Sequence, residues 1–194
     1  TALFTDSPYK YESGGDPDKI PQLTYEEFTA FYKKNYHPSN SYIFLFGKMD
    51  IEEKLAYLDR DYLSKYSAER FDNAIKHEKG SGIVRKEENY PVVEKKDNEA
   101  MYAAGFITGS SCDEERGLGY SILSYILMDT NASPVRTALM KNGFCSDTEG
   151  WYDSSMYDTV FTIIAKGAKE NAAGEFERTV SSELEKLTEQ GIDK

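Results

Sequence analysis

The pattern of apolar and polar positions predicts a helix followed by a buried strand near the start of the chain. Thr24 begins the helix as its N-cap, and Glu27 three residues later completes a capping box. Aromatic residues three and four positions apart give this helix one apolar face: Tyr25, Phe28, Tyr32 and Tyr36. The helix ends at His37-Pro38, because the residue before a proline is pushed out of the α region. Residues 41–46 are an almost unbroken apolar run, which predicts a strand buried on both faces.

A second helix closes this first module, which spans residues 24–66 as helix, strand and helix. Asp50 caps the helix, with a second carboxylate three residues later at Glu53. Its apolar stripe consists of Ile51, Leu55, Leu58 and Tyr62. Residues 1–23 are rich in proline, glycine and aspartate and predict an irregular lead-in. The charged, small-residue stretch 67–82 predicts a linker.

The second module, residues 83–194, begins with strands and continues with a helix. Three strands are expected at residues 83–86, 92–96 and 100–108. The last two are separated by a turn around Asp97-Asn98. The helix covers residues 113–128, and its expected buried face is Leu118, Ile122 and Ile126.

The rest of the second module is predicted as a short helix, two strands and a last helix. Ser133 and Pro134 are a favourable N-cap and first-turn pair for the short helix, which ends before Gly143. Two strands follow, joined by a turn at residues 153–155: residues 144–152 and 156–166. The last helix begins at Asn171, ends at Gly191 and has one apolar face: Phe176, Val180, Leu184 and Leu187. Strands next to strands, with helices in blocks, indicate an α+β domain.

Composition and charge narrow the class of protein. With 194 residues, including 15 Tyr, 10 Phe and 1 Trp, the chain has the material for a packed core. The formal net charge of −11 argues against nucleic acid or an anionic membrane as a partner, because both need clustered Lys and Arg. No apolar run approaches the ~20 residues that span a bilayer. Two cysteines without a CxxC pair favour a reducing, intracellular compartment, and Thr1 in place of Met indicates a processed product or a cut piece.

The sequence predicts no catalytic or metal-ligating residue in this chain. A zinc site on one helix needs two histidines one turn apart, as in H-x-x-E-H. The two histidines, His37 and His77, lie forty residues apart. We expect His37 to serve at its helix end and His77 to be solvated in the linker. No base is placed beside Cys112 or Cys145 to activate a thiolate.

Other candidate groups have structural explanations. Pairs of acids occupy the first turns of the expected helices, where they complement the helix dipole: Glu26-Glu27, Glu52-Glu53 and Glu114-Glu115. Gly117 and Gly119 fall inside a helix pattern, which favours close packing over phosphate binding. Trp151 and Tyr152 could contact a peptide, although aromatic residues at strand ends are usually part of a core or its rim.

The start of the chain resembles a known family of peptidases. The segment LFTDSPYKYESGGDPDKIPQLTYEEFTAFYKKNYHPSNSYIFLFG is similar to the one that closes the first domain of inverzincins of the pitrilysin/insulinase superfamily, above all the presequence-protease branch. The matching residues are Tyr11, Ser13, Gly14, Gly15, Asp16, Pro17, Ile20, Pro21, Leu23, Thr24, Tyr25, Glu26, Tyr36, His37, Pro38, Ser39, Asn40 and Gly47. A looser second match covers most of residues 83–191 and includes Ser133, Pro134, Val135, Leu139, Gly143, Lys166, Gly167 and Gly191.

The resemblance implies a parent zinc metalloendopeptidase that degrades peptides in an enclosed chamber, with a glutamate as general base for a zinc-bound water. In that family the H-x-x-E-H motif and the third zinc ligand precede the Ser13-Gly14-Gly15 segment, and an Arg/Tyr pair comes from the distant C-terminal half. No catalytic or metal residue is therefore transferred to this chain, and its substrate-binding residues are unknown. The resemblance implies that the parent holds the zinc and that this chain is an inactive internal fragment, a scaffold and chamber wall.

The same resemblance implies a fold and partners. The fold is an α+β metallopeptidase domain of the LuxS/MPP-like type, with an antiparallel or mixed sheet and helices packed on one face. Residues 24–66 would close the parent's first domain, and residues 83–194 would form most of the second. Residues 24–65 could instead complete the second module as a circularly permuted single domain, or exchange in a domain-swapped homodimer. Expected partners are peptide substrates and the remaining domains, in a bacterial cytoplasm or an organellar matrix.

Two other classes of function stay open. The parent could be a non-catalytic relative that also lacks the metal motif and acts as a structural or binding subunit. The chain could also be a separate peptide-binding module that uses Trp151 and neighbouring tyrosines. The residues upstream of Thr1 and a titration with short peptides discriminate these alternatives.

Overall fold

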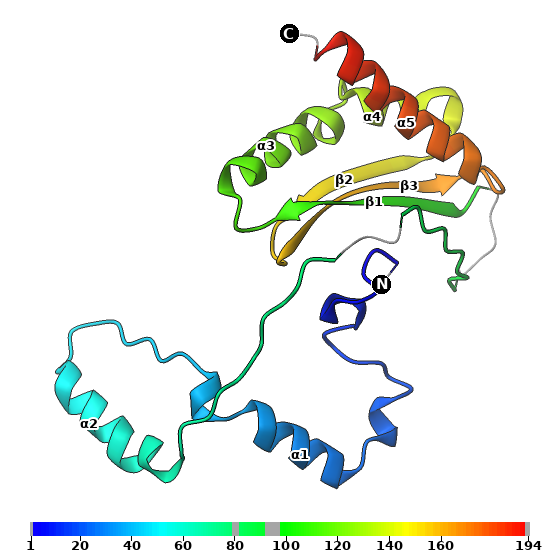
Figure 1. Cartoon of the computed structure of the whole chain (residues 1–194). Helices are drawn as coiled ribbons and strands as arrows, with labels where there is room; N and C mark the ends of the chain where they lie inside the picture. The colour runs from blue at the N-terminus through cyan, green and yellow to red at the C-terminus, as the bar shows by residue number, and fades with distance from the viewer. Residues whose placement is uncertain (1, 79–81, 92–97, 193–194) are drawn as a thin grey trace. The chain divides into compact units, whose positions relative to one another are not determined.

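The chain folds as two compact units, each of which is described by itself (Figure 1). The computed structural model describes residues 2–78, 82–91 and 98–192. The sheet unit comprises Thr1–Lys10 together with Ile75–Lys194, and the helical unit comprises Tyr11–Ala74. The expected irregular lead-in is therefore divided between the two units.

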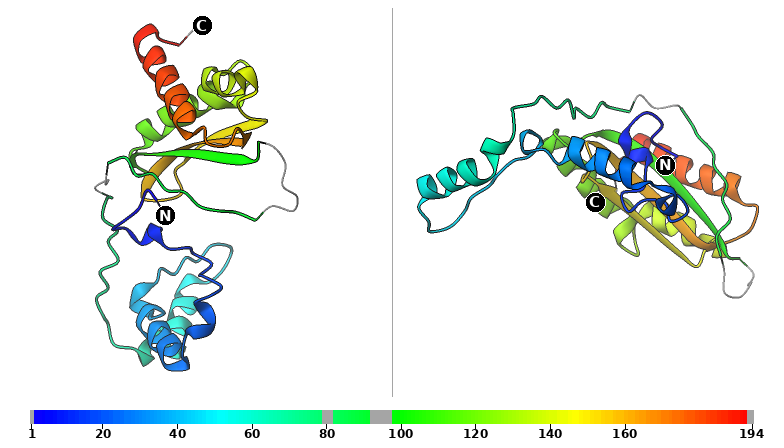
Figure 2. Two further views of the ribbon diagram at one scale, coloured as in Figure 1. Left: turned by 90° about the vertical axis from the view of Figure 1, so that its right-hand side faces the viewer. Right: turned by 90° about the horizontal axis from the view of Figure 1, so that it is seen from below.

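The sheet unit is an α+β domain, as the sequence predicts. Its described strands form an antiparallel sheet in the order β1-β3-β2: β1 (Ala100–Ser110), β2 (Asp147–Asp153) and β3 (Asp158–Ala168). Its helices are α3 (Glu114–Ser124), a π-helix (Tyr125–Asp129), α4 (Pro134–Met140) and α5 (Ala173–Gln190). Figures 1 and 2 show these helices over one face of the sheet.

The core of the sheet unit lies between the helices and the central strand β3. Ile163 and Ala165 of β3 are completely buried, as are Val135 and Leu139 of α4. The rest of the buried cluster is Leu127, Met128, Phe144, Cys145, Phe161, Ala168, Phe176 and Val180. Removing this apolar surface from water is the main stabilising contribution to the unit.

The signals expected at the helix ends are confirmed in part. Pro134 is the first residue of α4, as expected, but the Ser133 side chain makes no capping hydrogen bond to this helix, and its hydroxyl accepts from the Thr130 N–H at 3.0 Å instead. Helix α5 starts at Ala173, two residues later than expected, because Asn171 adopts a left-handed conformation with φ of 55°. The expected face of α5 is correct: Phe176 and Val180 are buried, and Leu184 and Leu187 pack against the core.

The expected buried face of the 113–128 helix is wrong. Leu118 and Ile122 are 64% and 53% exposed, whereas Leu127 and Met128 are buried. The α-helix ends at Ser124 and continues as the π-helix, whose wider turn rotates the following residues relative to a regular helix. The buried residues Ser124, Leu127 and Met128 lie three and four positions apart, so the buried face is a regular one but not the face that Leu118 and Ile122 indicate.

The helical unit contains α1 (Tyr25–Asn35), α2 (Ile51–Asp61) and short 3₁₀ turns. The capping box of α1 is confirmed: the Glu27 N–H donates to Thr24 Oγ1 at 3.2 Å, and the Thr24 N–H donates to Glu27 Oε2 at 2.9 Å. Asp50 caps α2 by accepting from the Glu53 N–H at 3.0 Å. Helix α1 ends before His37, which is in an extended conformation, as the following proline predicts.

The strand expected at residues 41–46 is wrong. This segment pairs with no strand among the described residues, and Phe44 and Phe46 are 86% and 87% exposed. A single extended segment has no partner for its backbone N–H and C=O groups, so an apolar pattern alone does not make a strand. The circularly permuted domain stays a prediction, because it concerns a contact between two units that are each described by themselves.

The expected strands before β1 have different outcomes. Residues 83–86 are not a strand, because they too lack a hydrogen-bonded neighbour among the described residues. Residues 92–96 lie outside the described residues. The strand expected from residue 100 is confirmed as β1, and those expected at residues 144–152 and 156–166 are confirmed as β2 and β3 with shifted ends.

Candidate functional site

The two histidines lie in different units. His37, in the helical unit, accepts a hydrogen bond from the Ser39 N–H at 3.2 Å and lies 3.8 Å from the carboxylate of Glu69. His77 belongs to the sheet unit. Among the residues that the structure describes, no group of three or more His, Cys, Asp or Glu side chains could hold a metal ion. The described donor atoms therefore do not fit a zinc site, and we derive no zinc chemistry from them.

His77 is exposed, as the sequence suggests, but it also contacts the start of β3. Its Nδ1 hydrogen-bonds Oδ1 of Asp158, whose residue is only 1% exposed. Its ring stacks on Tyr157, with 4.4 Å between the ring centroids. The other carboxylate oxygen of Asp158 accepts from the Glu78 N–H at 2.8 Å. The buried carboxylate thus has partners on both of its oxygens.

The carboxylate of Glu78 holds residues from the beginning of the chain. Its Oε2 accepts from the backbone N–H groups of Thr5, Asp6 and Ser7 at 3.0, 3.1 and 3.2 Å. Its Oε1 accepts from the Thr5 hydroxyl at 2.8 Å. Desolvation acts to raise the pKa of Glu78, but these four hydrogen bonds outweigh it and lower the pKa below its ordinary value.

These residues, Thr5–Ser7, His77, Glu78 and Asp158, form what we call the polar clasp. An aromatic contact extends it: the Tyr157 N–H donates to the Tyr9 hydroxyl at 2.8 Å, and Tyr9 packs edge-on against the buried Phe4. Sequence reasoning missed the polar clasp. Its bonds join residues more than 70 positions apart, and no local pattern around Glu78 or Asp158 indicates such a pairing.

Cys145 does not have the environment of a nucleophile. Cys145 is buried, and its Sγ contacts the Leu139 carbonyl oxygen at 3.4 Å. Burial raises the pKa of the Cys145 thiol, Asp147 adds to the increase, and Arg136 opposes it. A reactive cysteine needs a lowered pKa, so Cys145 has the properties of a core residue. Cys112 is exposed.

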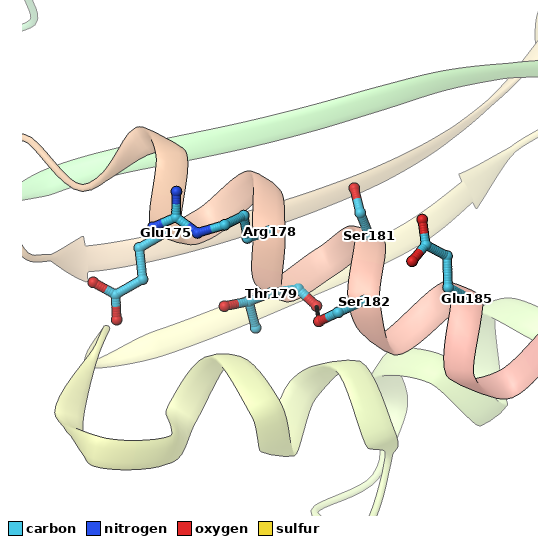
Figure 3. A pocket seen from close by; sticks show the side chains of 6 residues that line it. All are labelled: Glu175, Arg178, Thr179, Ser181, Ser182 and Glu185. Atoms are coloured by element: carbon cyan, nitrogen blue, oxygen red, sulfur yellow. Dashed lines mark hydrogen bonds between the residues drawn. The ribbon is translucent and has the colours of Figure 1, made fainter.

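A hollow of about 440 Å³ lies along α5 (Figure 3). Its lining residues are Glu175, Arg178, Thr179, Ser181, Ser182 and Glu185. Figure 3 shows that all six side chains come from this one helix. A single helix surface supplies no opposing wall of polar groups to orient a ligand, which a binding site requires.

Trp151 is the exposed aromatic residue of β2. It lies opposite Thr162 of β3 and is 43% exposed. Side chains alternate along a strand, and at Gly150 an added Cβ would lie 2.4 Å from Met128 under the helices. Trp151 therefore lies on the face of the sheet away from the helices, where it could contact another chain.

None of the helices in the described part of the chain has both the length and the apolar character needed to cross a bilayer. A family model described as "Peptidase M16 inactive domain" matches residues 22–194. Protein HypA of Clostridium perfringens is 39% identical over 195 residues, which cover 99% of this chain and 20% of that protein. Presequence protease 1 (chloroplastic/mitochondrial) of Arabidopsis thaliana is 32% identical over 202 residues, which cover 99% of this chain and 18% of that protein.

Two solved structures share the fold. A protease from Helicobacter pylori has a TM-score of 0.56 at 18% identity, covering 93% of this chain and 43% of the other. An M16-like peptidase from Alicyclobacillus acidocaldarius has a TM-score of 0.57 at 17% identity, covering 99% of this chain and 45% of the other. The chain spans about a fifth of the length of the curated relatives that it matches.

Proposed function

Because this chain belongs to the family of the peptidase M16 inactive domain, we propose that it is an internal, non-catalytic part of a longer zinc metalloendopeptidase. Its role there is that of a scaffold and a wall of the chamber in which peptides are cleaved. Two facts support the proposal: relatives named presequence protease extend far beyond the matched region, and the described residues offer no metal-binding cluster. Zinc and the general base belong to the rest of the polypeptide.

The observation that carries the proposal is the surface of the helical unit. None of residues 11–74 is buried, and large aromatic side chains face solvent: Phe28, Phe31, Tyr32, Phe44 and Phe46. A module with its own core buries such side chains, and a large exposed apolar surface marks a binding site for another chain or domain. We infer that the remaining domains of the same polypeptide cover this surface.

Within this proposal, residues 24–66 close one domain of the parent and residues 83–194 form most of the next. The relatives named chloroplastic and mitochondrial, together with bacterial ones, favour an organellar matrix or a bacterial cytoplasm as the location.

The test is expression of the full reading frame that contains this chain. We expect one tightly bound zinc per chain and cleavage of short unstructured peptides that a chelator abolishes. Replacing Phe44 and Phe46 by Asp should greatly reduce the yield of folded, active enzyme, because two charges would enter a buried contact. The matched control is Glu12→Asp with Glu88→Asp, two exposed positions, which should leave activity unchanged.

Two results would contradict the proposal. A full-length protein without zinc or cleavage would favour the non-catalytic relative. Full activity of the Phe44→Asp/Phe46→Asp variant would show that the aromatic surface of the helical unit is not a domain contact.

A further inference from the structure

The chain leaves the sheet unit after Lys10 and returns to it at Ile75. The two stems of this excursion, residues 5–7 and residues 77–78, are joined directly by hydrogen bonds. Four donors from Thr5, Asp6 and Ser7 converge on the Glu78 carboxylate, across a separation of 71 to 73 residues. A carboxylate that accepts several N–H and O–H bonds is a strong, charge-assisted contact.

The stems are also fixed to the sheet. Asp158 is the first residue of β3, the central strand, and is buried. It accepts from the Glu78 N–H and hydrogen-bonds His77, so the returning stem is held at a rigid point. Tyr157, next to it, donates its N–H to the Tyr9 hydroxyl, which holds the leaving stem at the same place.

The outgoing segment also has an apolar anchor. Phe4 is buried, and Leu3 lies over Gly105 of β1, where an added Cβ would be 2.7 Å from Leu3 Cδ1. Gly105 and Trp151 both lie opposite Thr162, so they share the face of the sheet that the helices leave free. The segment of residues 2–10 is thus a strap that lies against this face and is tied down by the polar clasp.

We propose that the polar clasp is a junction lock. When it is closed, residues 2–10 stay on the sheet unit and the excursion of residues 11–74 starts and ends at one fixed place. When it is open, the strap leaves the sheet while β1, β2 and β3 stay folded. Every hydrogen bond of the lock is made by the sheet unit itself, so the lock does not depend on the proposed peptidase function.

The experiment measures hydrogen exchange by mass spectrometry in the 194-residue chain and its Glu78→Gln variant. Glutamine keeps the shape, but it loses the charge and presents a donor to groups that also donate. We expect exchange in residues 2–10 to become about tenfold faster or more, with no change in β1 and β3. Trypsin cleavage after Lys10 should accelerate in parallel.

The matched control is Glu88→Gln. Glu88 is an exposed carboxylate of the same unit that pairs with Lys86 at 2.7 Å and makes no contact with the polar clasp. This variant should match the wild type. The proposal is overturned when Glu78→Gln and Glu88→Gln show the same exchange in residues 2–10, or when β1 and β3 lose protection together with the strap.

A milder variant covers the case in which Glu78→Gln does not fold. Thr5→Val removes only the hydroxyl that donates to Glu78 Oε1 and keeps the side-chain shape. Faster exchange confined to residues 2–10 supports the lock, and unchanged exchange there contradicts it.

Discussion

The helical register of residues 114–129 gives the sharpest test of the structure. Leu118 lies in α3 and Leu127 in the π-helix that follows it. The two residues are of the same type, but Leu118 is exposed and Leu127 is buried. Leu127 is 6% exposed and belongs to the core, whereas Leu118 is 64% exposed. The apolar pattern of the sequence predicts a buried Leu118, but a separation of nine residues, or about two and a half turns, places Leu118 and Leu127 on opposite sides of a helix. We therefore expect Leu127→Ala and Leu118→Ala to differ strongly in their effect on stability.

The sizes of the two effects follow from burial. Leu127→Ala removes a buried side chain and leaves a cavity, which costs about 2–5 kcal/mol in the free energy of unfolding. Burying a leucine completely contributes about 1.5–3 kcal/mol to stability. Leu118 is buried over only about a third of its surface, so Leu118→Ala should lower the free energy of unfolding by at most about 1 kcal/mol. For a urea dependence of about 2 kcal/mol per molar, only Leu127→Ala shifts the midpoint by about 1 M or more.

Urea unfolding followed by tryptophan fluorescence measures both variants. Trp151 is the single tryptophan of the chain and lies on β2, so its signal reports on the sheet unit alone. An equal or larger loss for Leu118→Ala would refute the register of this helix.

Three further predictions concern single sites. Gly150→Ala should destabilise the sheet unit by about 1–3 kcal/mol, because the added methyl group would overlap a core side chain. Gly119 in α3 has open space around it, so Gly119→Ala should stabilise the unit by up to about 1 kcal/mol. The urea midpoints of the two variants measure both effects. Hydrogen bonds from Arg85 lower the pKa of Glu177, so this pair stabilises above the unfolded-state pKa and is lost as the pH falls through the folded-state value. NMR titration should therefore give Glu177 a higher pKa in Arg85→Gln, and an unchanged pKa would contradict the pairing. Cys145 should resist a thiol reagent until the unit unfolds, and labelling in native conditions at the rate of a free thiol would contradict its burial.

Local signals in the sequence predicted much of the secondary structure. The Thr24–Glu27 capping box and the proline at the first position of α4 are local signals, so they can be recognised without knowledge of the fold. The family could also be recognised, because the motif from Tyr11 to Gly47 is long and specific. The match to the M16 inactive domain over residues 22–194 confirms it.

Features that depend on distant partners could not be predicted. Residues 41–46 have the composition of a buried strand, but pairing requires a neighbour that no local pattern identifies. The buried face of the helix at residues 114–124 could not be identified from its apolar residues, because Leu118 and Ile122 are exposed and Ser124 is buried. The polar clasp joins Glu78 to Thr5 across 73 residues, which is beyond any periodicity.

The most direct test of the account measures zinc binding and peptide cleavage by the 194-residue chain itself. Equilibrium dialysis against zinc, together with a fluorescent-peptide cleavage assay, should show neither stoichiometric binding nor turnover, because the proposed function assigns the catalytic centre to the rest of the parent polypeptide. One zinc bound per chain with turnover that a chelator abolishes would contradict the account.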